Sequence, residues 1–184
     1  MCRTTYALIG LDVRLALKVL ERHSEGTVKI WPRPYGLGYL GDLVVLLGGE
    51  FHEQECRGIV ESFYMTGEVL YVHFLTAEKP MHKAMELLKE RYPNLEIKYF
   101  AWDAYNHFYE SNDKCMQFFA GDYVVKSYVN GEANEFFSVT ELEVLLWAKR
   151  ITGVECKSVD EVERIKLKPR EYIRITKCQY TELF

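Results

Sequence analysis

The sequence has no cysteine pair at the close spacing of a disulfide framework or a zinc site. Its five cysteines are odd in number and far apart: Cys2, Cys56, Cys115, Cys156 and Cys178. Small secreted domains use even sets at short spacing, so this pattern predicts reduced thiols in the cytoplasm. The apolar stretch 6–11 ends at Asp12 and is too short for a signal peptide, and no apolar run has the ~18 residues of a membrane span. We therefore expect a soluble cytoplasmic protein without a membrane partner.

The sequence also lacks a basic excess. Its net charge is −4 and its pI is about 5.8. Positive charge is concentrated only at 164–170 (RIKLKPR), where Glu163 and Glu171 flank it. Because contacts to phosphates supply most of the affinity of nucleic-acid binders, this composition predicts that nucleic acid is not a partner.

Motifs for catalysis, nucleotides and metals are scarce. There is no G-x-S-x-G nucleophile motif. Gly36, Gly38 and Gly41 spell G-x-G-x-x-G, but the residues that follow predict a strand rather than a helix, so we interpret the motif as a glycine-rich connection. His52 and Cys56 stand four residues apart on a predicted helix, yet two ligands do not make a zinc site. The sequence thus predicts no cofactor and no metal.

The composition that is present favours one packed domain over 1–184. The chain is 48% hydrophobic and 14% aromatic, which is enough to build a core without disulfides or metal. Alternation, helical spacing and turn residues predict, in order, a strand over 4–11, a helix over 13–20, a strand over 27–31, a loop over 32–42, a strand over 43–47, a helix over 51–63 and a strand over 68–75. This β-α-β-β-α-β order is that of a ferredoxin-like motif, which we place at about 4–75.

The second half, about 79–184, is expected to extend the sheet and to add a C-terminal helical pair. A helix is predicted over 80–92 and a strand over 95–102, followed by further strands between 108 and 129 and a turn at 130–131. The later signals are a capping box at Ser138 and Glu141 with Phe137 and Leu142 as a hydrophobic staple, a helix end at Gly153, a second box at Ser158 and Glu161, and a strand over 171–178. The predicted fold class is α+β, with a mainly antiparallel sheet and helices chiefly on one face.

Titratable side chains are densest between 103 and 113. Asp103 and His107 would share one face of a strand but lie roughly 13 Å apart, and Glu110 would point to the other face. A bulge or hairpin within the segment would be needed to unite them in an acid–base site. Otherwise these are polar residues at the mouth of a β-hairpin.

The strand over 95–102 carries large aromatic side chains on both faces. Its odd positions are more consistently apolar and should face the helix layer. We expect Phe100 and Trp102, on the other face, to be covered either by the helix that contains Leu142, Leu146 and Trp147 or by a second subunit. Phe100 and Trp102 are therefore candidate binding residues.

A family resemblance covers about 70–110. A strand ends in Phe74-Leu75-Thr76-Ala77, Pro80 opens a helix, 91–95 (RYPNL) closes it, and an aromatic strand ends in Tyr109-Glu110. This arrangement resembles the ferredoxin-like domain of the Api-type proteins carried by phages, plasmids and genomic islands. That family usually has a tryptophan-rich segment before the first of these strands, and here YGLGYLG stands nearest its place. The resemblance implies a ferredoxin-like sheet and an accessory protein of a mobile element, and it transfers no functional residue.

Two functions remain as hypotheses. The first is a non-enzymatic accessory protein that acts by binding another protein or by self-association, which the missing catalytic motifs and the abundant aromatic residues favour. The second is a small hydrolase-type enzyme with an acid–base site near Asp103, His107 and Glu110.

Overall fold

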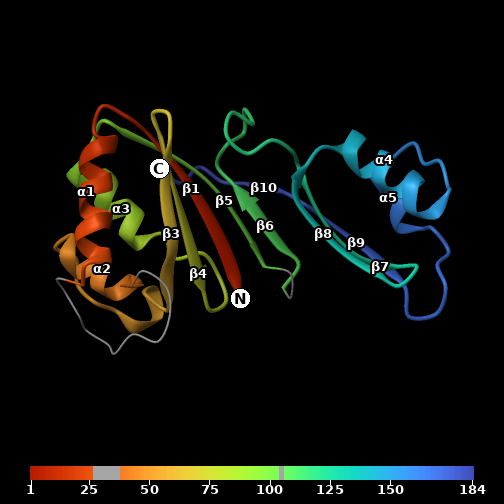
Figure 1. The fold of residues 1–184 in the computed structure, drawn as a ribbon, viewed down its shortest axis with the longest axis horizontal. Coiled ribbons are helices and arrows are strands. Elements are labelled where there is room, and N and C mark those ends of the chain that lie inside the picture. The colour runs from red at the N-terminus through yellow and green to blue at the C-terminus, as the bar shows by residue number, and fades with distance from the viewer. Residues whose placement is uncertain (27–37, 104–105) are drawn as a thin grey trace.

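The computed structural model describes residues 1–26, 38–103 and 106–184, which form an α+β fold with mostly antiparallel sheets, as predicted (Figure 1). The first elements are β1 (Cys2–Gly10), α1 (Val13–Ser24), β2 (Gly38–Tyr39), α2 (Leu40–Leu46), the 3₁₀ turn η1 (Glu53–Glu55), β3 (Gly58–Thr66), β4 (Val69–Thr76), α3 (Lys83–Arg91), β5 (Leu95–Asp103) and β6 (Phe108–Ser111). The later ones are β7 (Tyr123–Val129), β8 (Glu132–Val139), α4 (Glu141–Thr152), α5 (Val159–Glu163), β9 (Tyr172–Lys177) and β10 (Gln179–Tyr180). Within these ranges, no helix is long and apolar enough to cross a membrane.

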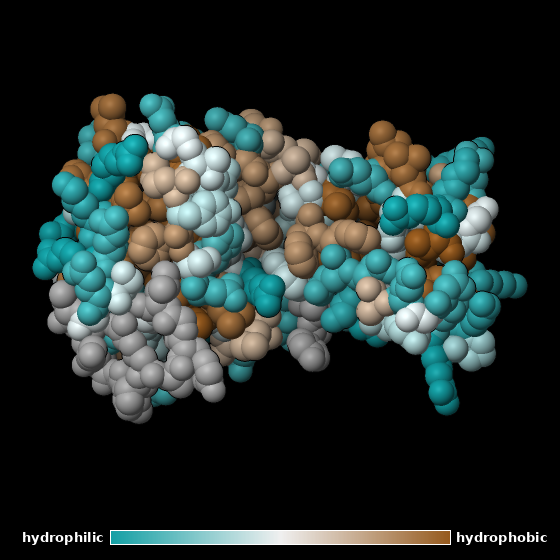
Figure 2. Space-filling model, viewed as in Figure 1, coloured by the Kyte–Doolittle hydropathy of each residue, from teal (hydrophilic) through white to brown (hydrophobic). Residues whose placement is uncertain are grey.

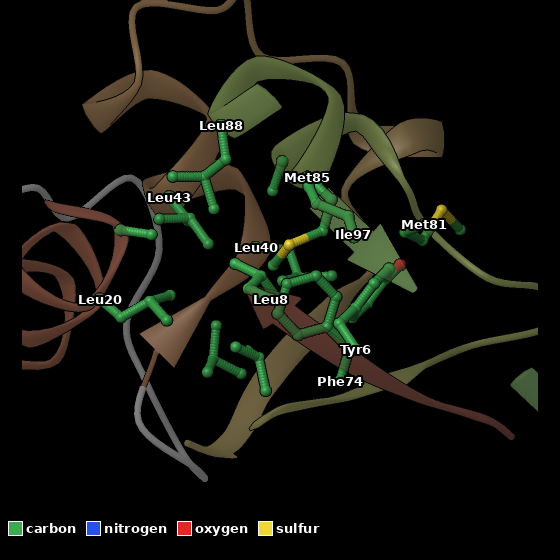
Figure 3. Packing of buried hydrophobic residues seen from close by; sticks show 14 of the residues in the cluster. Tyr6, Leu8, Leu20, Leu40, Leu43, Phe74, Met81, Met85, Leu88 and Ile97 are labelled. Carbon is green, nitrogen blue, oxygen red and sulfur yellow. The ribbon is translucent and has the colours of Figure 1, made fainter. Parts of the chain in front are cut away.

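The larger sheet, sheet A, has the strand order β10-β6-β5-β1-β4-β3-β2. Its neighbours pair antiparallel, except that β10 runs parallel to β6. Helices α1, α2 and α3 lie on one face of this sheet (Figure 1). Figure 3 shows the packing between them, where Leu8 and Phe74 from the strands meet Leu20, Leu43 and Met85 from the helices.

The smaller sheet, sheet B, has the order β8-β7-β9 and carries α4 and α5 on one face (Figure 1). Its other face joins sheet A through a separate buried cluster that contains Trp102, Tyr109, Val124 and Cys178. The chain crosses from sheet A to sheet B after β6 and returns in β10, so the last strand ties the two sheets together.

Several predicted elements are confirmed because their side-chain periods are clear. The alternation of β5 places Leu95, Ile97, Tyr99 and Ala101 in the core beside the helices. Met81, Met85 and Leu88 are buried as predicted, although α3 begins at Lys83 and not at Pro80. Gly153 ends α4 with a left-handed φ of 74°, which glycine adopts without a steric penalty.

Two predicted elements are wrong. Residues 43–46 belong to helix α2 and Leu47 is its C-cap; Leu40, Leu43, Val44 and Leu47 are buried at helical spacing. A continuous apolar run does not distinguish a buried strand from a buried helix, and here the helix forms. The predicted helix 51–63 is instead η1 followed by β3, which pairs with β4 through a tight turn at Gly67. The predicted strand 27–31 lies outside the described residues.

The residues after the glycine motif form a helix, not the predicted strand. Gly38 lies in β2, and Gly41 lies in the first turn of α2, where an added Cβ would come within 2.6 Å of the rings of Tyr39 and Phe51. However, β2 pairs antiparallel with β3, whereas a dinucleotide site needs a parallel β-α-β unit. Close packing of the helix therefore accounts for Gly41.

The first predicted capping box is displaced by two residues. Thr140 is the N-cap of α4, and its hydroxyl and backbone amide are reciprocally bonded with Glu143. Ser138 instead donates to the carbonyl of Ala120, and Leu142 is exposed and so does not form the predicted staple. Of the second predicted box only the cap forms: the Ser158 hydroxyl accepts from the amide of Glu161, whereas the Glu161 carboxylate accepts from the amide of Lys157.

Candidate functional site

The three predicted acid–base residues lie among different neighbours. Asp103 is fully buried at the end of β5, where it accepts from Asn106 and lies 3.3 Å from the N-terminal ammonium of Met1. His107 Nε2 lies 3.1 Å from a guanidinium nitrogen of Arg174. Asp103 and His107 both line a cavity, but its volume is about 10 Å³, roughly the space of one water molecule. That cavity cannot accommodate a substrate.

Glu110 belongs to a different cluster, on the helix-covered face of sheet A. Its Oε1 lies 3.4 Å from His82 Nε2 and accepts a hydrogen bond of 3.1 Å from the hydroxyl of Tyr99. His82 Nδ1 lies 2.9 Å from the hydroxyl of Tyr6, and Thr181 Oγ1 lies 2.8 Å from that of Tyr99. Burial raises the pKa of Tyr6 well above its usual value, so this phenol stays protonated.

The segment 179–184 covers this cluster. The Phe184 ring packs edge-on against the rings of Tyr6, His82 and Tyr99, with centroid distances between 5.7 and 6.5 Å. The side chains of His82 and Glu110 are consequently only 12% and 14% exposed. The cluster holds a His–Glu pair with the chemistry of an acid and a base, but Phe184 stands where a substrate would have to approach.

Sequence reasoning found Glu110 but missed the residues that surround it. His82 and Thr181 are separated from Tyr6 and Tyr99 by 76 and 82 positions respectively, and only the pairing of β1, β5, β6 and β10 brings them together. In the sequence, only the inward-facing position of Tyr99 on β5 pointed to this cluster.

Phe100 and Trp102 are covered, as expected, but by a different part of the chain. Trp102 is 7% exposed, and its ring stacks on that of Phe137 in β8 at 4.4 Å. Phe100 packs edge-on against Phe119 at 4.8 Å, in the connection between the two sheets. The prediction that helix α4 or a second subunit covers them is therefore wrong, because sheet B and the preceding loop fill that space.

Sheet B carries an apolar groove between α4 and strands β7 and β8, which we call the α4 groove. Its volume is about 370 Å³, and it is lined by Val125, Phe136, Val139, Glu143, Val144, Leu146, Trp147 and Arg150. Trp147 is 8% exposed, and its Nε1 has no hydrogen-bond partner among the described residues. The Nε1 atom itself is buried, and a buried indole donor without an acceptor is costly.

The rim of the α4 groove combines leucines with charges. Leu142 is 65% exposed and Leu146 is 60% exposed, and Figure 2 shows hydrophobic atoms reaching the surface over α4. Hydrogen bonds from Thr140 lower the pKa of Glu143, so its carboxylate is ionised, and its Oε1 has no partner in the described chain. Arg150 likewise forms no ion pair or hydrogen bond with any described residue.

The described residues contain no group of three or more side chains arranged to hold a metal ion. His52 and Cys56 flank η1 and do not share a helix face, so their spacing of four residues does not indicate a zinc site. Comparisons with protein-family models, with curated proteins and with solved structures find no match to this chain. Function must therefore be argued from the geometry alone.

Proposed function

We propose that this protein is non-enzymatic and acts by binding a protein chain in the α4 groove. The observation that carries the proposal is an apolar groove lined by the exposed Leu146, with the exposed Leu142 about one helical turn earlier on α4. Complete burial of a leucine contributes about 1.5–3 kcal/mol, so a partner that covers both gains substantial binding energy. Trp147 fits the same role, because aromatic residues in desolvated pockets are typical hot spots of protein interfaces.

The proposal extends to the fold and the setting of the protein. We infer a ferredoxin-like core, which the strand order β5-β1-β4-β3, with α1 and α3 on one face, supports. We place this core at about 2–103 rather than at 4–75, because α2 and β3 replace the elements predicted there. With the resemblance over 70–110, this supports an accessory protein of a mobile element. The cysteine usage and net charge support a cytoplasmic protein that does not bind nucleic acid.

A small hydrolase-type enzyme is the alternative, and its best support is now the His82–Glu110 pair rather than Asp103 or His107. It ranks second because Phe184 covers that pair and Tyr6 and Tyr99 contact it through hydrogen bonds. Removal of the Phe184 ring by Phe184→Ala should create no hydrolytic activity toward a panel of ester, amide and phosphate substrates. Turnover that appears in this variant and disappears on His82→Gln would favour the enzyme.

The binding proposal is tested with matched pairs of exposed leucines. Leu142→Gln/Leu146→Gln alters the groove, whereas Leu11→Gln/Leu15→Gln alters exposed leucines near α1. We expect tagged native protein and the α1 variant to capture the same partner from extracts of the source organism, and the groove variant to lose it. Titration of the purified partner against all three proteins should then show at least about a tenfold weaker Kd for the groove variant. Equal binding by the three proteins would contradict the proposal.

A further inference from the structure

We propose that the chain bound in the α4 groove is a second copy of this protein, with the two α4 helices packed antiparallel about a two-fold axis. This inference rests on the proposed function, since it names the partner of the same surface. A second copy is the expected occupant because the exposed charges of one α4 helix are complementary to those of another α4 helix.

The complementarity follows from the positions of two residues. Glu143 and Arg150 are seven positions apart, which is two helical turns or about 10.5 Å along the helix axis. Both line the α4 groove, with Leu146 between them. A two-fold axis near Leu146 and Trp147 places Glu143 opposite Arg150 of the partner subunit, and the same contact repeats on the other side. A parallel arrangement would instead oppose like charges.

Both charges are available for this contact. In the described chain Arg150 has no counter-ion, and Glu143 uses only Oε2 to cap the helix. The neighbouring cation Lys149 already pairs with Glu155 at 3.1 Å. Arg150 is thus the basic group of α4 whose charge awaits a partner, and the matching carboxylate is present on the same helix.

The apolar side chains stabilise the contact, but the area they bury is small. Two copies contribute two exposed leucines each. Interfaces that bury less than about 1,200 Å² belong to the weak, transient class. We therefore expect a dimer with a Kd in the micromolar range, weakened by salt because its charge pairs lie at the rim.

The test reverses each charge in a separate chain. In Arg150→Glu and in Glu143→Arg, every rim pair of a homodimer becomes repulsive, and sedimentation velocity should show dimerisation weakened at least about tenfold. Mixing the two variants restores both attractive pairs, so a heterodimer should form with a Kd within about threefold of the native value. Lys149→Glu is the matched control and should dimerise like the native protein.

Two further measurements keep the test decisive. Because Glu143→Arg removes half of the capping box, thermal unfolding of each variant alone checks that it is folded. Glu143→Gln preserves the cap but removes the charge, and it should weaken the dimer less than Glu143→Arg. A native protein that stays monomeric at several hundred micromolar, or charge variants that do not assemble when mixed, would overturn the self-association. If the native protein then captures a different protein and Leu142→Gln/Leu146→Gln does not, the binding function stands without the dimer. If this variant captures the same proteins as the native protein, both proposals fall.

Discussion

The N-terminal unit, residues 2–111 with sheet A and α1–α3, and the C-terminal unit, residues 123–177 with sheet B, α4 and α5, bury their apolar side chains to different extents. Among the described residues, the main core of the first contains 24 buried hydrophobic side chains, whereas that of the second contains six. Helices α1 and α4 are equally long, and both expose leucine: Leu15 of α1 is 43% exposed, and Leu142 and Leu146 of α4 are 65% and 60% exposed. Among the described residues, the C-terminal unit therefore has the smaller main core.

Two buried polar sites, one from each unit, differ in their hydrogen bonding. In the N-terminal unit His82 uses both ring nitrogens, and the hydroxyls of Tyr6 and Tyr99 are paired. In the C-terminal unit the indole donor of Trp147 has no partner among the described residues. A buried donor without an acceptor costs stability.

The largest expected effect compares one core residue from each unit. Phe74 is fully buried among β-strands and helices, so Phe74→Ala should lower the free energy of unfolding by about 3–5 kcal/mol. Val144→Ala removes two methyl groups from the smaller core and should cost about 2 kcal/mol. Urea unfolding monitored by circular dichroism measures both. A loss for Phe74→Ala no larger than that for Val144→Ala would contradict the larger contribution expected from Phe74.

The junction between the units supplies the next effect. Trp102→Ala should cost about 3 kcal/mol, at the lower end for a buried aromatic, because the stacked ring of Phe137 is itself partly exposed. Since the covering layer comes from the same chain, the loss should be the same at 2 and at 200 µM protein, roughly spanning the weak-dimer range. A loss that appears only at the higher concentration would assign Trp102 to an interface between subunits.

A smaller effect should appear at alkaline pH. Burial raises the pKa of the Cys2 thiol from 9.0 to about 11, so between pH 9 and 11 the unfolded chain releases a proton that the folded chain keeps. Stability is therefore fully present below pH 9 and is lost as pH rises, with a slope of up to about 1.4 kcal/mol per pH unit from this thiol. Cys2→Ala should make the decline shallower, and Cys115→Ala, an exposed control, should not. Identical slopes in both variants would contradict the assignment.

The fold was predictable where side-chain period and turn chemistry agree. Alternation identified β1, β4 and β5, and helical spacing identified α1 and α3. The run LVVLL had no such period, so α2 was predicted as a strand. At α4 the sequence holds two overlapping boxes, Ser138 with Glu141 and Thr140 with Glu143, and local reasoning had no basis for choosing the second.

The sites depended on long-range pairing, which the sequence does not encode locally. Glu110 was selected for its charge density, but its partner His82 lies 28 positions away and is placed by α3. Leu142 and Leu146 were expected to cover Trp102. They instead face outward, because Val144, Trp147 and Ala148 form the buried side of α4. The groove is exposed because the other side of α4 is the one that packs on sheet B.

The smallest expected effect is also the sharpest test of the contrast between the units. Leu146→Gln keeps helix propensity nearly constant and replaces a side chain that is already mostly exposed. The free energy of unfolding should change by less than about 0.5 kcal/mol. Leu88→Ala, in the fully buried face of α3, should instead cost about 2–5 kcal/mol. Both should be measured near 1 µM protein, roughly below the expected dimer Kd, so that association adds no stability. If Leu146 contributes nothing to the stability of the monomer and is nevertheless required for assembly, its position serves a partner. If Leu146→Gln instead lowers the free energy of unfolding by more than about 1 kcal/mol, Leu146 belongs to the C-terminal core.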